Sequence, residues 1–303
     1  MSGQFNAERV TTQEMNIVYD ELKEKVGNKL AGFELSLTLE DKKDHGDIDI
    51  LVLLHIDQNP KSLIESLNPL QLNKNGHCYS FLYKSNIGKT VQVDFIVSSD
   101  PILHNTKKQY YAFNCLSAVI GIMAKSYNFK YSTEGFFKRY KDKKGNWHDI
   151  LISKNLNPGL QCLGLDPKPL WIKTCDDIVN YVSSSLMFDS SIYKFALDSE
   201  DRYKDIFINL MDMKKISVIK DEDYFFKRCF PDQYNEVNGK KVEIDRKVYA
   251  ISKYNGTWLR EKFGIKPGPE MGRILKLISD SFGDLLSEVE EDFVEAFVAE
   301  RLQ

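Results

Sequence analysis

Apolar residues recur at two different spacings along the chain. In the first half they fall in short stretches, partly alternating with polar residues, which is typical of strands. We expect strands over residues 33–39, 47–54, 78–84 and 90–97, and a strand hairpin joining 132–140 to 147–153. A Thr-x-x-Glu capping box at Thr11 precedes apolar residues at helical spacing and predicts a helix that ends at Gly27. Further helices are expected over 61–69 and 110–127.

The second half has a different pattern. Residues 155–169 are rich in Pro, Gly and Asn and predict a linker. Helices are expected beyond it over residues 175–187, 189–197, 200–213, 222–228, 270–281 and 284–302. The fold class is therefore α+β: a mixed sheet with helices over residues 1–154, followed by a mainly helical domain over residues 155–303.

Composition indicates a soluble globular protein. The chain has 303 residues, 42% of them hydrophobic and 28% charged, and its net charge of −3 gives no overall attraction to nucleic acid or membrane. The five cysteines form no CxxC pair, which favours a reducing compartment. The N-terminal residues have no apolar core of a secretory signal, and no apolar run approaches the ~20 residues that span a bilayer. We expect a cytoplasmic or nuclear protein without a membrane partner.

Two carboxylates stand at the entrance of one predicted strand. Asp47 and Asp49 open the stretch DIDILVLL, and strand alternation turns both to one face and the isoleucines beside them to the other. Carboxylates held this close repel each other, and a divalent cation relieves the repulsion. A third acid, Asp94, interrupts the apolar stretch VQVDFIV. Three acids on neighbouring strands suit two Mg²⁺ or Mn²⁺ ions that activate a hydroxyl for phosphoryl displacement.

These two segments, Gly46–Val52 and Val91–Ile96, resemble the motif of the DNA polymerase β-type nucleotidyltransferase superfamily. The resemblance implies a palm-like catalytic domain over residues 1–154. It also implies that Asp47 and Asp49 bind both metals, while Asp94 binds one and helps to deprotonate the acceptor hydroxyl. The alternative is that the three acids serve as a turn cap, a solvent-facing residue and the partner of a lysine.

The sequence departs from the superfamily upstream of these acids. The superfamily carries a Gly-Ser turn there, whose backbone N–H groups hold the triphosphate. In this chain the region reads LSLT, so Ser36 matches the serine and the glycine is absent. Lys42 and Lys43, in the loop before the acids, can supply positive charge instead, or they can be solvated surface lysines.

A basic, aromatic-rich segment follows the third acid. Residues 101–154 hold ten lysines and arginines against three acids, which suits a phosphate-rich substrate. Within it, the stretch from Gly121 to Phe136 is similar to the one after the third Asp in poly(A) polymerases and archaeal-type CCA-adding enzymes. This similarity implies that Lys125 contacts the nucleotide phosphates, assisted by Tyr131 and Ser132. The alternative for Lys125 is a solvated lysine at the end of a helix.

The segment from Lys253 to Leu275 resembles part of the helical body of bacterial and eukaryotic CCA-adding enzymes. Gly268, Pro269 and Glu270 have the residue types of a helix start. This helix start can either contact an RNA backbone phosphate or serve the fold alone.

These features predict a metal-dependent nucleotidyltransferase that moves NMP from an NTP to a hydroxyl, with an RNA 3′ end, tRNA first, as the expected acceptor. Two alternatives remain. One is transfer to a protein or a small molecule. The other is a catalytically inactive module of the same fold that binds nucleic acid.

Overall fold

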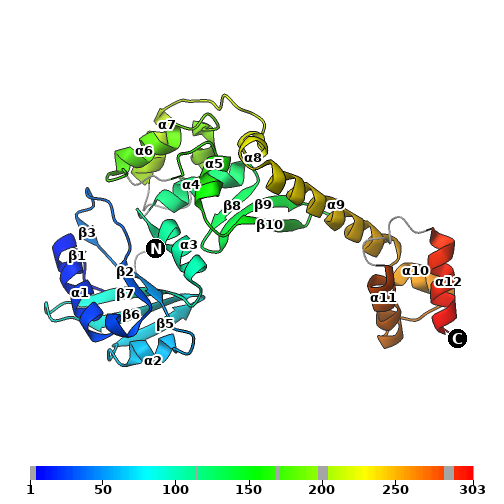
Figure 1. Cartoon of the computed structure of the whole chain (residues 1–303), viewed down its shortest axis with the longest axis horizontal. Coiled ribbons are helices and arrows are strands. Elements are labelled where there is room, and N and C mark those ends of the chain that lie inside the picture. The colour runs from blue at the N-terminus through cyan, green and yellow to red at the C-terminus, as the bar shows by residue number, and fades with distance from the viewer. Residues whose placement is uncertain (1–4, 114, 168–170, 197–203, 283–289, 303) are drawn as a thin grey trace. The chain divides into compact units, whose positions relative to one another are not determined.

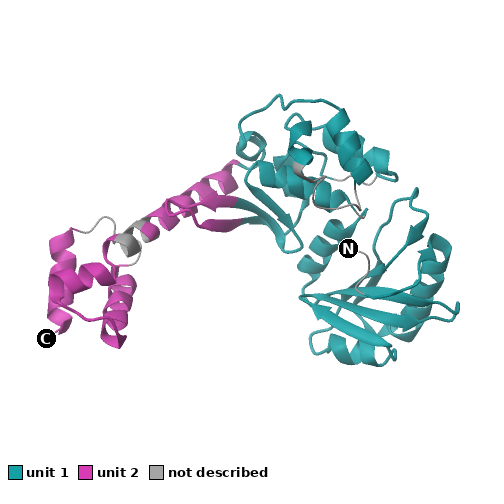
Figure 2. Cartoon of the chain, turned by 180° about the vertical axis from the view of Figure 1, so that it is seen from behind, with its two compact units in different colours: residues 1–138, 151–230 teal, residues 139–150, 231–303 magenta. Residues whose placement is uncertain are grey.

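The computed structural model describes residues 5–113, 115–167, 171–196, 204–282 and 290–302 (Figure 1). The chain divides into two compact units (Figure 2). Unit 1 comprises residues 1–138 and 151–230, and unit 2 comprises residues 139–150 and 231–303. The predicted division into a catalytic and a helical domain at residue 154 stays a prediction. The compact units have other boundaries, since residues 151–230 belong to the same unit as residues 1–138.

Unit 1 is built on a five-stranded mixed sheet in the order β2-β4-β7-β6-β5. Its strands are β2 (Gly32–Leu35), β4 (Ile48–Leu53), β5 (Gln71–Asn75), β6 (Cys78–Lys84) and β7 (Thr90–Ser98). The central pair, β4 and β7, is parallel, and the other pairs are antiparallel. The four strands expected in this region are present, but β2 stops at Leu35, and β5 was not predicted.

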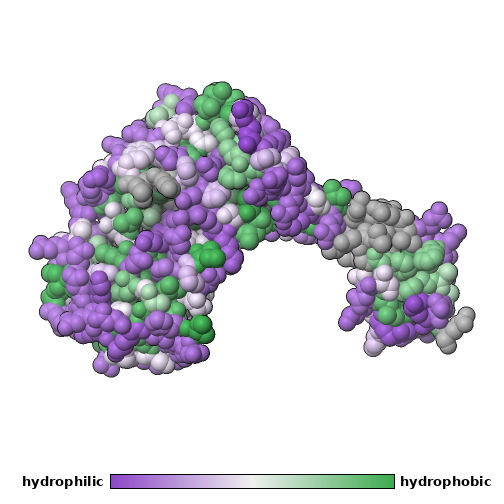
Figure 3. All heavy atoms as spheres, in the orientation of Figure 1, coloured by the Kyte–Doolittle hydropathy of each residue, from purple (hydrophilic) through white to green (hydrophobic). Residues whose placement is uncertain are grey.

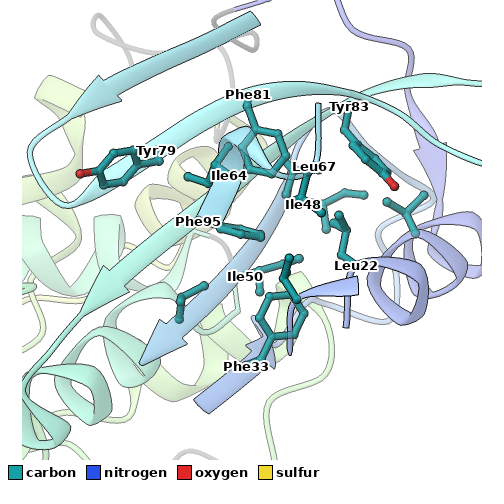
Figure 4. Packing of buried hydrophobic residues seen from close by; sticks show 14 of the residues in the cluster. Leu22, Phe33, Ile48, Ile50, Ile64, Leu67, Tyr79, Phe81, Tyr83 and Phe95 are labelled. Carbon is teal, nitrogen blue, oxygen red and sulfur yellow. The ribbon is translucent and has the colours of Figure 1, made fainter. Parts of the chain in front are cut away.

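One face of this sheet forms the main hydrophobic core (Figure 4). Helices α1 (Thr12–Lys25) and α2 (Pro60–Glu65) cover it. The predicted capping box is confirmed: the Thr11 side chain accepts from the Glu14 backbone N–H, and the Glu14 carboxylate accepts from that of Thr11. Ile48 and Ile50 are fully buried on this face beside Phe81 and Phe95. Residues that alternate with them on β4 and β7 therefore point to the opposite face.

The single helix expected over residues 110–127 is two helices. Helix α3 (Pro101–Tyr111) begins earlier than predicted, since the Asp100 side chain caps it and Pro101 takes the first position. Helix α4 (Leu116–Ser126) follows. Between them Phe113 has a φ of 59°, which a continuous helix does not allow.

A second sheet has three strands in the order β10-β9-β8. The boundary between the two units divides β9 and β10, so only part of this sheet belongs to unit 1. The elements not yet given are β1 (Val10–Thr11), η1 (Gly27–Lys29), β3 (Asp44–His45), β8 (Phe129–Ser132), β9 (Gly135–Lys141), β10 (Trp147–Ser153), α5 (Asn157–Cys162), α6 (Cys175–Ser183), η2 (Ser190–Ala196), α7 (Lys204–Asp212) and α8 (Tyr224–Cys229). The expected linker thus contains α5, and the helix expected over residues 189–197 is a 3₁₀ helix. The start of the helix expected over residues 200–213 lies outside the described residues.

The described residues of unit 2 form the distal part of the β9–β10 hairpin and the helices α9 (Pro231–Lys253), α10 (Gly256–Phe263), α11 (Pro269–Phe282) and α12 (Glu291–Leu302). Helix α11 begins at Pro269, as the sequence predicts. Residues 284–289 of the last expected helix lie outside the described residues, and α9 and α10 were not predicted. Leu259, Val294 and Val298 form part of a small second core.

The α+β class is confirmed by the mixed sheet and its helices in unit 1 and by the helices that dominate the C-terminal part. Hydrophilic and apolar residues are interspersed on the surface shown in Figure 3. Within the described ranges, no helix is long and apolar enough to span a membrane.

Candidate active site

Two of the three predicted acids lie side by side on the central strands. The parallel register of β4 and β7 places Asp49 opposite Asp94. Neighbouring strands are about 4.8 Å apart, so two carboxylates at paired positions project from adjacent points of one sheet face. This face is opposite the hydrophobic core, because the residues flanking Asp49 on β4 are buried in the core.

The third acid, Asp47, precedes β4 and acts electrostatically on the same region. Burial raises the pKa of Asp94, and the charge of Asp47 raises it further. Hydrogen bonds from Gln92 and Ser80 oppose this rise. Gln92 Nε2 donates to Asp94 Oδ1 over 3.0 Å. Ser80 stands opposite Asp94 in the β6–β7 register.

Two further groups belong to this region and were missed by sequence reasoning. Burial and then the charge of Asp94 raise the pKa of the Cys78 thiol to about 12, with smaller contributions from the other two acids. The pKa of Tyr111 is raised by burial first, with contributions from Cys78 and Asp49. A lone cysteine and a helical tyrosine carry no sequence signal of this placement.

The three carboxylates offer the hard oxygen donors that Mg²⁺ and Mn²⁺ prefer. A cation would also relieve the charge repulsion that contributes to the raised pKa of Asp94. Among the described residues, however, no three His, Cys, Asp or Glu side chains are arranged as a metal-binding group. The three acids have the oxygen donors that these metals prefer, and they lie in the same region of unit 1. Their assignment as metal ligands stays a prediction.

Ser36 lies next to this site, but its hydroxyl has a structural partner. Its backbone N–H donates to the carbonyl oxygen of Asp49 over 3.0 Å. Its Oγ donates to the carbonyl oxygen of Tyr111 over 2.8 Å, and the side chain is buried. The hydroxyl therefore connects the end of β2 to the end of α3, and the predicted triphosphate contact stays a prediction.

The loop between β2 and β4 carries Lys42, partly exposed, and Lys43, exposed. Strands β1 and β3 pair at its end, where Arg9 Nε donates to Asp44 Oδ1 over 2.9 Å. At its middle, the backbone N–H of Glu40 donates to the carbonyl of Lys173 over 2.7 Å. The loop is thus held from two sides immediately before the acids.

The remaining predicted phosphate contacts have mixed outcomes. Lys125 is exposed in the last turn of α4, where it is available to a ligand. Tyr131 is buried, and its ring stacks on that of Tyr110, with 5.6 Å between centroids. Ser132 Oγ donates to the carbonyl of Gly135 in the β8–β9 turn. Tyr131 and Ser132 therefore have roles in packing and in turn formation, and their predicted phosphate roles stay predictions.

Comparison with known proteins gives matches among solved structures. No family model matches the chain, and no curated protein matches it. Two solved structures of Leishmania infantum polymerase beta, a ternary P/T complex and a ternary gap complex, are similar to it, with TM-scores of 0.35 and 0.34 and identities of 15% and 16%. The matches cover 43% of this chain and 58% and 51% of the polymerase chains. The chain thus spans little more than half the length of the polymerases that it matches.

Proposed function

We propose that the protein is a metal-dependent nucleotidyltransferase that transfers NMP from an NTP to a hydroxyl, most of all to an RNA 3′ end. The observation that carries this proposal is the register that puts Asp49 opposite Asp94 on the sheet face away from the core. Asp47 stands two residues before Asp49, where its charge acts on Asp94. The three acids follow one another along the chain as in the motif of the polymerase β-type superfamily. The pairing of Asp49 with Asp94 across β4 and β7 is the geometry that this motif requires.

The residues of the site have separate roles in this proposal. Asp47 and Asp49 would hold two Mg²⁺ ions, and Asp94 would hold one of them. The bound ions would neutralise the charge of the triphosphate and of the departing pyrophosphate. Asp94 would accept the proton of the attacking hydroxyl, and its partly buried position, which raises its pKa, makes it a better base than a solvated carboxylate. Lys42, Lys43 and Lys125 would hold phosphate oxygens by charge.

Transfer of label from [α-³²P]NTP to RNA, DNA or the protein itself tests the proposal. We expect Mg²⁺-dependent label on RNA and its loss when EDTA removes the metal. Asp49→Ala should reduce transfer by about 10²–10³-fold or more, because it removes a carboxylate that would hold the ions that neutralise charge in the transition state. Full activity of Asp49→Ala on any acceptor contradicts the proposal. Label on protein instead of RNA would favour protein nucleotidylation, and RNA binding without any transfer would favour an inactive module.

An exposed basic hairpin supports nucleic acid as the acceptor. Trp147, on β10 in unit 2, is 50% exposed. The Arg139 guanidinium lies 5.0 Å from its ring centroid, and the Lys141 ammonium 5.9 Å. Lys143 and Lys144 are exposed in the turn beside it. Positive groups around an exposed aromatic ring suit an unpaired base and its phosphates.

Trp147→Ala should weaken binding of single-stranded RNA by about 1–3 kcal/mol, the contribution of one stacked base. Fluorescence anisotropy of a labelled oligonucleotide measures this. Trp171→Ala is the matched control, because Trp171 is similarly exposed (47%) but packs on Tyr181. Equal losses in both variants, or none in Trp147→Ala, would remove the hairpin from the binding surface.

A further inference from the structure

A cavity in unit 1 has no role in the function proposed above. It has a volume of about 260 Å³ and lies where β7 ends and α3 begins, beside the turn between β5 and β6. The polar and charged residues that line it are Lys74, His77, Ser98, Ser99, Asp100 and Lys107. Apolar side chains, among them those of Leu54, Val97 and Leu103, form part of the remaining wall.

Lys107 is a buried cation in the wall of this cavity. Its side chain, on α3, is only 7% exposed. Its Nζ donates to the carbonyl oxygen of Val97 over 2.6 Å. No carboxylate of the described residues forms an ion pair with it, and burial lowers its pKa. The charge of Glu134 opposes this lowering but forms no ion pair with Lys107. A buried ammonium without a paired carboxylate is costly, and an anion in the cavity would offset that cost.

Ser98, which also lines the cavity, is a second and independent indication that the cavity holds a ligand. The residue is 6% exposed, and its buried Oγ has no hydrogen-bond partner in the described part of the chain. Buried hydroxyls in native proteins are almost always hydrogen-bonded, so an orphaned one at a cavity wall calls for a ligand or water. An anionic oxygen would accept a hydrogen bond from the Ser98 hydroxyl.

The other charged groups of the wall are compatible with an anion. Lys74 is exposed at the mouth, with its ammonium 5.2 Å from the ring centroid of Tyr79, which also lines the cavity. The acid of the wall, Asp100, is already engaged: it accepts the backbone N–H of Ile102 over 2.8 Å and faces Lys154. Two lysines thus face the cavity against one acid that has its own partners.

We propose that this cavity binds a small molecule through a phosphate group, held by the charges of Lys107 and Lys74 and by a hydrogen bond from Ser98. A phosphate dianion matches two lysines, whereas a carboxylate would balance one of them. The cavity has room for more than the phosphate itself, and its apolar wall would contact the organic part of the ligand. This inference does not depend on the proposed nucleotidyl transfer.

Isothermal titration calorimetry with inorganic phosphate tests this proposal in the full-length protein. EDTA is present, so that no metal can carry phosphate to the three acids, and chloride keeps the ionic strength constant. We expect saturable binding that Lys107→Met weakens by about tenfold or more. Lys108→Met is the matched control, because this neighbouring lysine is exposed and ion-pairs with Glu34. It should bind phosphate as the wild type does.

Ser98→Ala keeps the test decisive if Lys107→Met fails to fold. It removes only a hydroxyl without a partner, so the fold should tolerate it, and phosphate should bind several-fold more weakly. Phosphate should also raise the melting temperature of the wild type more than acetate does at equal ionic strength. The proposal is overturned if about 10 mM phosphate gives neither heat nor a melting shift, or if Lys107→Met and Ser98→Ala both bind like the wild type.

Discussion

Asp94→Asn will strongly reduce nucleotidyl transfer and, at neutral pH, make the metal-free protein more stable. Asparagine keeps the size of the side chain, and its oxygen can still accept the hydrogen bond from Gln92. It cannot accept the proton of a hydroxyl and is a poorer ligand for Mg²⁺. We expect transfer to fall by about 10³-fold in the labelled-NTP assay.

The gain in stability follows from the raised pKa of Asp94. Burial lifts this pKa above the ordinary value of 3.8, so the folded state holds the proton more tightly than the unfolded chain does. The resulting stability is complete below the unfolded-state pKa and is lost as the pH rises through the folded-state pKa. Wild type and Asp94→Asn should therefore match at a pH of about 3 and diverge as the pH rises.

Thermal unfolding in EDTA at acidic and neutral pH measures this divergence. Near pH 7 we expect the variant to melt about 2 °C or more above the wild type. Added Mg²⁺ should then stabilise the wild type more than the variant, because a metal bound to the ionised carboxylate reverses the penalty. Asp57→Asn, at an exposed loop carboxylate, is the control and should change neither activity nor stability. A variant that melts like the wild type at both pH values would refute the role of burial.

The acids themselves could be predicted because each interrupts a local pattern. A charged residue in an alternating apolar strand stands out whatever the rest of the chain does, and strand alternation fixes its face. The register that pairs Asp49 with Asp94 could not be predicted. It depends on the packing of β4 against β7, two strands far apart in the sequence, and no local rule sets the pairing of parallel strands.

The contacts that Ser36 and Tyr131 make in the structure could not be predicted, because they join distant parts of the chain. The hydroxyl of Ser36 bonds to a carbonyl 75 residues away, so no local pattern distinguishes it from a phosphate-binding serine. Tyr131 is one of many aromatic residues in a basic segment, and no local pattern predicts that its ring stacks on that of Tyr110. The break at Phe113 was missed because the apolar residues around it kept a helical spacing, whereas its backbone has a positive φ.

The helices that were missed have different local causes. Helix α9 is largely polar, so its apolar spacing gives a weak signal. Helix α5 lies in a segment rich in Pro, Gly and Asn, where turn-forming residues hide a short helix whose second residue is Pro158.

Lys138→Met will cause a large loss of stability, because it removes a buried cation that holds two carboxylates. The Lys138 side chain is 1% exposed and connects β9 to the start of α8. Its Nζ donates to Asp223 Oδ1 over 2.7 Å and to Glu222 Oε1 over 3.2 Å, and it lies 4.3 Å from the ring centroid of Phe129. Methionine keeps the contact with the ring and leaves two carboxylates without their cation.

The expected cost of Lys138→Met is about 3–5 kcal/mol, the range for removing one partner of a buried ion pair. Chemical denaturation followed by circular dichroism measures it. Lys143→Met, at an exposed lysine in the turn after β9, is the control and should change stability by less than about 0.5 kcal/mol.

The double variant Lys138→Met/Asp223→Asn separates the cost of an orphaned charge from the value of the pair. Asp223 has a side chain that is only 12% exposed, so its carboxylate alone is poorly solvated once Lys138 is gone. Neutralising it should restore a large part of the lost stability, because most of the penalty lies in burying an unpaired charge. Glu222, 42% exposed and also bonded to Asn128 Nδ2, should remain solvated and contribute little to the loss. If the double variant is no more stable than Lys138→Met, the penalty comes instead from the lost contacts of the ammonium with the Phe129 ring and with the carbonyl of Tyr127.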